Sequence, residues 1–312
     1  ASTFFGVKEN NFLGKGIKLD SNITLSEETI KGQIFVVNPN FNNSDRDMIF
    51  NLQSLETDRL SNFGYKTNKN AVSIGTNFEH LDDLFLSPRL ELNNEKIETS
   101  SSASDRLKKQ EGSYLDVTGL YTLAYDKRNQ KFEPSDGFIT KFSQELPLSF
   151  NDTQTIINGY EITNYHEYIE NNVLRLSFYS KAANSLGDKD VRISQRLYAP
   201  TSRLRGFERF KVGPTDNGDF VGGNYVTTVN ISAELPVLES LDSISINSFY
   251  DAANVWGVDY NSSIDDSNKI RSSTGLAANW FTPIGPLTFS FAHPITKAST
   301  DKTEGFRFNL GT

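Results

Sequence analysis

Few side chains in this sequence have the types and spacing that covalent chemistry requires. The chain of 312 residues contains no cysteine and only three histidines, His80, His166 and His293. Without cysteine there is no thiol nucleophile, thiolate metal site or disulfide framework. The histidines lack the spacing of a Ser-His-Asp triad or a metal site, and no G-x-S-x-G, H-E-x-x-H, Walker or dinucleotide-binding motif occurs. We therefore predict that the protein is not an enzyme and uses no metal or cofactor.

Charge excludes a further class of partner. The formal net charge is −8 and the isoelectric point is near 5.1, so the chain offers no basic face for nucleic acid. The acidic segment 259–268, DYNSSIDDSN, is the nearest approach to a cation site. It lacks the glycine and terminal glutamate of an EF-hand loop, so we interpret it as a solvated loop.

The segment 203–207, RLRGF, is the most distinctive group of polar residues. It lies in a long polar stretch and combines arginine, glycine and an aromatic side chain. The planar guanidinium of Arg205 can bind carboxylates through paired hydrogen bonds. Gly206 permits a tight turn beside it, and Phe207 can pack against a wall. The chemistry that this segment suggests is therefore recognition of a carboxylate.

Two carboxylates in the following strands are candidates for that role. Alternation within 224–235 and 243–256 places Glu234 and Asp251 on the polar faces of adjacent strands. Buried charges on such faces require water or partners. Two interpretations remain open from the residues alone. Either the loop folds inward and Arg205 meets both carboxylates, or Arg205 is solvated on an outer loop.

Alternation of apolar and polar residues is the dominant pattern along the chain. In 287–292, LTFSFA, the residues Leu287, Phe289 and Phe291 form one face of a strand and smaller residues form the other. Such runs predict about sixteen strands. We place them at 2–9, 16–26, 30–38, 46–60, 70–79, 84–93, 113–126, 137–147, 156–169, 173–184, 190–199, 224–235, 243–256, 271–281, 286–297 and 304–312.

These strands are best arranged as one transmembrane antiparallel β-barrel. Mean hydropathy is −0.46 and no run approaches the length of a transmembrane helix, but only alternate residues of a barrel strand face lipid. The aromatic content of 12% would supply interfacial girdles. A soluble β-sandwich is the rival fold, but its inner faces should be free of charge, and sixteen strands without a second core favour closure. We predict a single domain over 1–312.

The linkers vary in length, which in a barrel predicts long loops at one end and short turns at the other. The linker 93–112 is long, although it should lie at the end of the barrel that has short turns. We predict that it forms a mobile turn or a helical excursion. The other long linkers are 38–46, 126–137, 200–223 and 257–270, and the short ones are 186–190 and 282–286.

Several stretches, in order along nearly the whole chain, resemble the barrel domain of the BamA family, the outer-membrane protein-assembly insertases of Gram-negative bacteria. No single stretch is decisive, but together they are specific. They are GVKENNFLGKG (6–16), YDKRNQKFEPSDG (125–137), LRGF (204–207), GP…VGGN (213–224), FYDAANVW (249–256) and RSSTGLAANWFTPIGPLTFSFAHP (271–294).

The resemblance implies a role for the arginine-containing loop. In this family the sixth extracellular loop enters the barrel lumen, and its arginine pairs with acidic residues of the wall. The resemblance therefore favours the inward interpretation, with Arg205 bound by Asp251 and Glu234. The motif residues of this loop are then Leu204, Arg205, Gly206 and Phe207.

The sequence also departs from the family pattern. Leu204 replaces the valine of the family motif, and Ala253 stands where the family usually has glycine, which adds a methyl group near the seat of the loop. Periplasmic POTRA domains precede the barrel in this family, and we expect none in this chain. The family usually ends in an aromatic residue, whereas this chain ends in FNLGT, so we expect both ends to be trimmed.

The resemblance further implies that the first and last strands form a lateral seam. Glycines in these strands weaken pairing, and an exposed edge can accept an incoming strand. We expect the seam to be formed by Phe4, Phe5, Gly6, Val7, Gly305, Phe306, Phe308 and Gly311.

The implied function is to fold and insert client β-barrel proteins into the bacterial outer membrane. The implied partners are unfolded outer-membrane proteins, outer-membrane lipids and, through the POTRA domains, the lipoproteins of the assembly complex. Two alternatives remain. One is a related translocator of the TamA or two-partner-secretion type, which shares the loop motif, and the other is a passive porin of sixteen strands.

Overall fold

The structure is a computed structural model that describes residues 2–149, 153–236, 244–259, 268–282 and 285–310. Almost all regular structure in it is β-strand. The strands are β1 (Ser2–Phe12), β2 (Ile17–Ser26), β3 (Thr29–Asn38), β4 (Asp47–Arg59), β5 (Tyr65–Leu81), β6 (Leu84–Thr99), β7 (Gly112–Asp126), β8 (Gly137–Pro147), β9 (Thr155–Ile169), β10 (Asn172–Ser185), β11 (Thr215–Asp216), β12 (Asp219–Phe220), β13 (Tyr225–Glu234), β14 (Ile244–Trp256), β15 (Arg271–Thr282), β16 (Gly285–Thr296) and β17 (Phe306–Leu310).

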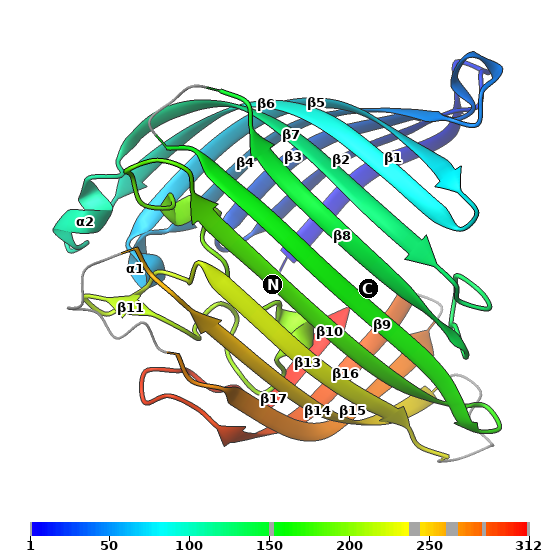
Figure 1. Cartoon of the computed structure of the whole chain (residues 1–312). Helices are drawn as coiled ribbons and strands as arrows, with labels where there is room; N and C mark the ends of the chain where they lie inside the picture. The colour runs from blue at the N-terminus through cyan, green and yellow to red at the C-terminus, as the bar shows by residue number, and fades with distance from the viewer. Residues whose placement is uncertain (1, 150–152, 237–243, 260–267, 283–284, 311–312) are drawn as a thin grey trace.

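One antiparallel sheet forms the wall of the molecule. Its fifteen strands follow the chain order from β1 to β10 and then from β13 to β17, while β11 and β12 form a separate hairpin. The sheet curls around the segment between β10 and β13, as Figure 1 shows. None of the described residues forms a helix that is long and apolar enough to cross a membrane. The expected all-β antiparallel fold is confirmed.

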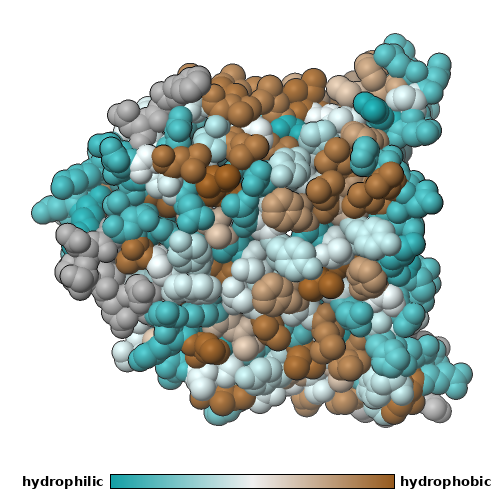
Figure 2. All heavy atoms as spheres, in the orientation of Figure 1, coloured by the Kyte–Doolittle hydropathy of each residue, from teal (hydrophilic) through white to brown (hydrophobic). Residues whose placement is uncertain are grey.

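The alternating sequence pattern becomes an apolar outer surface and a polar inner surface. On β13, Val229 and Ile231 are exposed large hydrophobic residues, whereas Val226 and Thr228, of opposite parity, are buried. On β14, Asp251 is fully buried and its neighbour Tyr250 is exposed. Brown, apolar side chains gather over the strands and teal, polar ones over the loops at both ends (Figure 2).

The predicted strand 190–199 is wrong, and it accounts for the difference between the sixteen expected strands and the fifteen that form the wall in the described residues. This segment lies in the inner loop and contains the short 3-10 helix η2 (Ile193–Gln195). Val191 and Ile193 are buried, but so are Arg192 and Arg196, which alternate with them. The apolar and the charged side chains of this segment thus both face the interior of the molecule. The alternation in the sequence therefore comes from the packing of a loop and does not mark the two faces of a strand.

The distribution of long linkers also differs from the expectation. Because successive strands are antiparallel, the linker 126–137 lies at the opposite end of the sheet from the linker between β10 and β13. The linker after β6 shares the end of the inner loop, and it contains the helix α2 (Asp105–Lys108), so the predicted helical excursion is confirmed. The helix α1 (Leu60–Phe63) lies at the same end, as Figure 1 shows.

The two edge strands of the sheet run in the same direction. Fifteen strands joined by antiparallel steps make fourteen reversals, which is an even number. Within the described residues β1 pairs only with β2, and β17 pairs only with β16. Direct pairing of β1 with β17 would therefore be parallel. One additional strand placed between them could pair antiparallel with both edges.

Candidate functional site

The segment 186–224 between β10 and β13 fills the interior of the sheet. Its apolar residues form two buried clusters with the wall. In the first, Leu204, Phe207 and Val212 of the loop pack with Ala253 and Val255 of β14. The extra methyl group expected at Ala253 is thus part of the seat of the loop, where this side chain is buried.

The second cluster closes one end of the interior. There Ile193 and Phe220 of the loop pack with Phe63 of α1 and Leu107 of α2. Ser104 caps α2 by accepting a hydrogen bond from the Leu107 amide. The short helices therefore hold the inner loop in place from the end of the barrel.

Arg205 binds Asp251 through three hydrogen bonds. Its Nε donates to Oδ2 at 2.8 Å, its Nη2 donates to Oδ1 at 2.8 Å, and its backbone amide donates to Oδ2 at 3.0 Å. The Asp251 side chain is fully buried, and that of Arg205 is 19% exposed. A bidentate pair of this kind is strong and directional, and loss of either partner would leave an uncompensated charge.

Three further residues complete the surroundings of this pair. Asn230 on β13 donates through Nδ2 to Asp251 Oδ1 at 2.9 Å, and Ser273 on β15 donates through Oγ to the carbonyl of Arg205 at 2.5 Å. The Arg205 guanidinium lies 3.5 Å from the ring centroid of Phe249, where a cation–π interaction adds to the attraction. Three adjacent strands therefore hold one arginine.

Glu234 does not take part in this cluster, which corrects the expectation that Arg205 binds both carboxylates. Its parity is as expected, because residues 230, 232 and 234 of β13 share a face. However, the residue level with Asp251 across the strand pair is Asn230, and Glu234 pairs with Asn247. Four residues separate the two positions, roughly 13 Å along a strand, which is too far for a shared guanidinium. Among the described residues Arg205 has Asp251 as its ion-pair partner.

Gly206 and Phe207 pass close to the wall. Gly206 has φ of +88°, and a Cβ atom there would lie 3.1 Å from Ala292 Cβ and 3.2 Å from Ser273 Cβ. Glycine is thus required both for the left-handed backbone and for the close approach. The side chain of Phe207 is 1% exposed, and Leu204 is buried beside it.

Sequence reasoning missed a second arginine anchor at the start of the loop. Arg192 donates to both carboxylate oxygens of Asp116 on β7, at 2.7 and 3.2 Å, and to Glu95 on β6 at 3.1 Å. Ser194 donates to the same Glu95 oxygen at 2.7 Å, and the Arg192 guanidinium lies 3.9 Å from the Tyr114 ring centroid. The Arg192 side chain is 1% exposed.

A third anchor lies between these two. Arg203 donates to Glu161 on β9 at 2.9 Å and to Ser177 on β10 at 2.7 Å. Taken together, the arginines attach the loop to strands on well-separated parts of the wall. The signal was available in the sequence, since residues 192–205 contain four arginines in fourteen positions. Their partners were not identifiable, because each acidic residue belongs to a distant strand.

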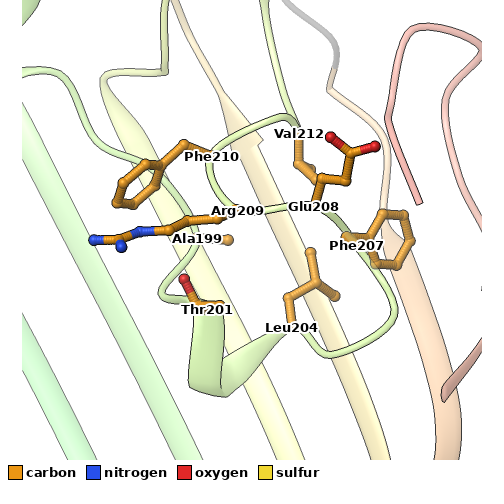
Figure 3. Close-up of a pocket in the computed structure, with 8 residues that line it drawn as sticks. All are labelled: Ala199, Thr201, Leu204, Phe207, Glu208, Arg209, Phe210 and Val212. Carbon is orange, nitrogen blue, oxygen red and sulfur yellow. The ribbon is translucent and has the colours of Figure 1, made fainter. Parts of the chain in front are cut away.

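The remaining part of the loop encloses a pocket that is too small for a ligand. It is lined by Ala199, Thr201, Leu204, Phe207, Glu208, Arg209, Phe210 and Val212 (Figure 3). It has room for about one water molecule. Arg209 extends away from Phe207 and lies 4.6 Å from the ring centroid of Phe210. Burial lowers the pKa of Arg209 below its usual value, and the nearby Arg59 lowers it further.

The expected seam residues lie on the two edge strands. On β1, Phe5, Gly6 and Val7 pair with Ile23, Asn22 and Ser21 of β2, and Phe4 pairs with Thr24. Residues 5–12 are exposed throughout. On β17, Phe306 and Phe308 pair with Phe291 and Phe289 of β16, with ring centroids 4.9 and 5.1 Å apart. Gly305 precedes β17, and Gly311 lies outside the described residues.

The three histidines lie apart, on β5, β9 and β16. His166 is 4.0 Å from Asp136 in an exposed pair, and His80 lies edge-on to Phe78. In the described part of the chain, no three His, Cys, Asp or Glu side chains are grouped in a way that could hold a metal ion.

Comparison with known proteins identifies relatives of the whole barrel. Residues 11–312 match the Omp85 superfamily domain. The outer membrane protein assembly factor BamA of Neisseria meningitidis serogroup B is 22% identical over 356 residues, which cover 98% of this chain and 44% of that protein. The sorting and assembly machinery component 50 homolog of Homo sapiens is 32% identical over 127 residues, 40% of this chain and 27% of that protein.

A solved structure has the same fold. BamA from Haemophilus ducreyi lacking POTRA domains 1-3 matches with a TM-score of 0.87 and 22% identity, over 98% of this chain and 66% of that one. The fold is therefore that of a BamA-like barrel. The chain spans less than half the length of the two curated relatives described above.

Proposed function

The chain belongs to the Omp85 superfamily, and from this premise we propose that it is the barrel of an outer-membrane protein-assembly factor. It is an integral outer-membrane protein that folds and inserts client β-barrels at a lateral seam between β1 and β17. The relatives that carry assembly in their names support this activity. The proposed work is non-covalent, since strand pairing forms hydrogen bonds and requires no covalent bond to be made or broken.

The observation that carries the proposal is that, within the described residues, each edge strand of a wall with an apolar outer face pairs with one neighbour only. Each edge strand presents a row of backbone N–H and C=O groups on one side. In lipid each unpaired group costs several kcal/mol, so a client strand that pairs there is stabilised as it enters the bilayer. The edges would thus act as templates for strand addition.

The inner loop has a supporting role in this proposal. A wall with a discontinuity needs bracing from within, and the arginines of the loop attach it to β6, β7, β9 and β14. The loop would keep the wall in shape while the seam accepts a strand. The motif residues Leu204, Arg205, Gly206 and Phe207 with Asp251 form the central attachment.

The partners follow from the same activity. Clients are unfolded outer-membrane proteins, and the lipids around the seam are the medium into which they insert. Assembly-complex lipoproteins would bind through POTRA domains outside this chain.

The proposal is tested by disulfide capture of a client strand, using the full-length protein in liposomes with all other cysteines removed. We introduce Val7→Cys on β1 and one cysteine in the terminal strand of a model client. The matched control is Leu90→Cys on β6, a strand with two neighbours that, like Val7, carries an exposed apolar side chain. We expect the client to fold and to be captured at residue 7 but not at residue 90.

The alternatives give different outcomes in the same liposomes. A translocator of the TamA or two-partner-secretion type would transfer a substrate without leaving it folded in the bilayer. A porin would give a large steady conductance with no client folding. Equal capture at residues 7 and 90 would reject the seam as the entry point.

A further inference from the structure

Within the described residues the last strand of the sheet is much shorter than its neighbour, and β16 determines where this strand begins. Five residues of β17 pair with Leu287–Phe291 of β16, although β16 is twelve residues long. The Ala292 amide still donates to the carbonyl of Gly305 at 2.9 Å. Two residues further, on the same side of the strand, Pro294 has no N–H to donate. Pairing with β16 therefore ends at this proline.

The chain preceding β17 pairs with the inner loop instead. Phe207 and Thr303 are antiparallel bridge partners. The Glu304 amide donates to the carbonyl of Gly206 at 3.0 Å, and the Glu208 amide donates to the carbonyl of Lys302 at 3.0 Å. The Lys302 amide donates in turn to the carbonyl of Lys211 at 3.0 Å. The segments 206–211 and 302–304, which we call the latch pair, thus form a short antiparallel contact inside the wall.

A side chain from β17 itself reinforces the latch pair. Arg307 donates through Nη2 to the carbonyl of Phe207 at 2.6 Å and through Nη1 to that of Thr201 at 3.2 Å. The guanidinium is held in position by Glu304, whose Oε2 accepts from Nη2 at 2.7 Å and from Nε at 2.9 Å. The Arg307 side chain is only 13% exposed. Charge-assisted hydrogen bonds of this kind are stronger than neutral ones.

The other end of the connector between β16 and β17 is fixed by a buried ion pair. Arg271 on β15 donates to both oxygens of Asp301, at 2.8 and 3.1 Å, and both side chains are fully buried. Asp301 also accepts from the amide of Ala298 at 2.6 Å and from that of Gly213 in the loop at 3.3 Å. The connector and the loop therefore share one anchoring carboxylate, and moving the loop away would remove the Gly213 hydrogen bond to Asp301 at a buried site.

We propose that the loop segment 206–211 is the permanent anchor of the edge strand β17, and that Arg307 is the positioning residue that fixes the strand to it. A continuous set of contacts then runs from Asp251 on β14, through Arg205 and Phe207, to Arg307. The position of one side of the seam is set by the inner loop as well as by β16. The significance for client assembly rests on the proposed function, but the anchoring itself does not.

The first experiment measures hydrogen exchange of the β17 amides in the full-length protein in nanodiscs. Arg307→Gln removes the bonds to two loop carbonyls, so these amides should exchange at least about tenfold faster than in the unmodified protein. Arg307→Lys keeps the charge but cannot bridge two carbonyls, and it should give an intermediate rate. Lys297→Gln removes an exposed charge from the same connector and is the matched control, with unchanged exchange. Unchanged exchange in Arg307→Gln would overturn the proposal.

The second experiment makes the latch pair covalent. Glu208 and Lys302 are opposite each other, one residue from the bridge partners Phe207 and Thr303, so Glu208→Cys with Lys302→Cys has the spacing for a disulfide. The oxidised protein should assemble clients at the unmodified rate, because a permanent anchor need not separate. The disulfide should also restore slow β17 exchange to Arg307→Gln. Each single cysteine is a control.

The outcomes separate this inference from the proposed function. Loss of assembly on oxidation, recovered by reductant, would show that the latch pair must open, and it would overturn permanent anchoring while leaving the assembly function intact. A protein that never assembles clients would reject the proposed function, whereas the exchange rates would still decide whether Arg307 anchors β17.

Discussion

At the scale of the residue, the decisive feature is a buried carboxylate whose satisfaction depends on one arginine. Asp251 is fully buried, and it accepts hydrogen bonds from Arg205 and Asn230. Removing one partner of such a pair is far more costly than the net stability that the pair contributes, because the remaining charge stays buried. The loop is therefore held by an interaction that tolerates little change.

Reversal of the arginine charge should release the loop. Arg205→Glu places two carboxylates together, and we expect a loss of about 3–5 kcal/mol in the stability of the seated loop. Asp251→Arg in the same protein should recover part of that loss. The measurements are protease resistance of the loop and client assembly in liposomes. Arg175→Glu, at an exposed position on β10, is the control and should have little effect. Normal assembly by Arg205→Glu would contradict a seated, required loop.

At the scale of the element, the inner loop behaves as a strut with several attachments. Arg192, Arg203 and Arg205 reach different strands, while the two apolar clusters fill the space between them. Asn230 donates hydrogen bonds both to the Arg203 carbonyl and to Asp251, so the attachments of Arg203 and Arg205 are coupled. Arg192 shares no partner with Arg205, so the contributions of these two to stability should be nearly additive. Damage to one end of the loop should then leave the other end seated.

The first attachment gives a direct test of this independence. Arg192→Met leaves Glu95 and Asp116 without their cation, which should destabilise the nearby part of the loop by about 3–5 kcal/mol. Adding Glu95→Gln and Asp116→Asn should recover most of the loss, because the buried charges are then gone. Proteolysis near residue 190 reports the release, and exchange of the Arg205 amide reports the far end. Equal loosening at both ends would argue for one cooperative unit.

At the scale of the whole molecule, the sheet is uneven in how firmly its strands are held. The strands β5 and β6 have neighbours on both sides and pair over long registers. In the part of the chain that the structure describes, β1 pairs with β2 alone and is exposed along most of its length. Opening free energies within a protein follow such differences in pairing and burial. The molecule is thus built with a firm region and a loose edge.

This difference predicts a gradient of hydrogen exchange across the sheet. In nanodiscs the β1 amides should exchange at least about tenfold faster than those of β5, since they have a single pairing strand. A client peptide that adds to the edge should slow exchange in β1 and leave β5 unchanged. Exchange in β1 as slow as in β5 without a client would contradict an available edge.

Much of this architecture could be predicted from local patterns. The alternation located all fifteen strands of the wall, because side-chain direction in a strand depends only on parity. The same parity placed Asp251 and Glu234 on the inner face. It could not exclude Glu234 from the Arg205 site, because the register between β13 and β14 decides which residues are level. Parity also predicted a strand at 190–199, which is wrong, because a loop packed inside a barrel can alternate apolar and polar residues without forming a strand.

The sequence by itself therefore determined the fold class, and it pointed to the motif 204–207 and to Asp251, which the structure places against Arg205. The tertiary structure alone decided that Arg192 meets Asp116, that Arg203 meets Glu161, and that Arg307 ties the last strand to the loop. The physical reason is the distance along the chain over which each kind of interaction acts. Parity and turn preferences act over a few residues, whereas these contacts join positions as far as 106 residues apart in the chain and exist only after the sheet has curled around the loop.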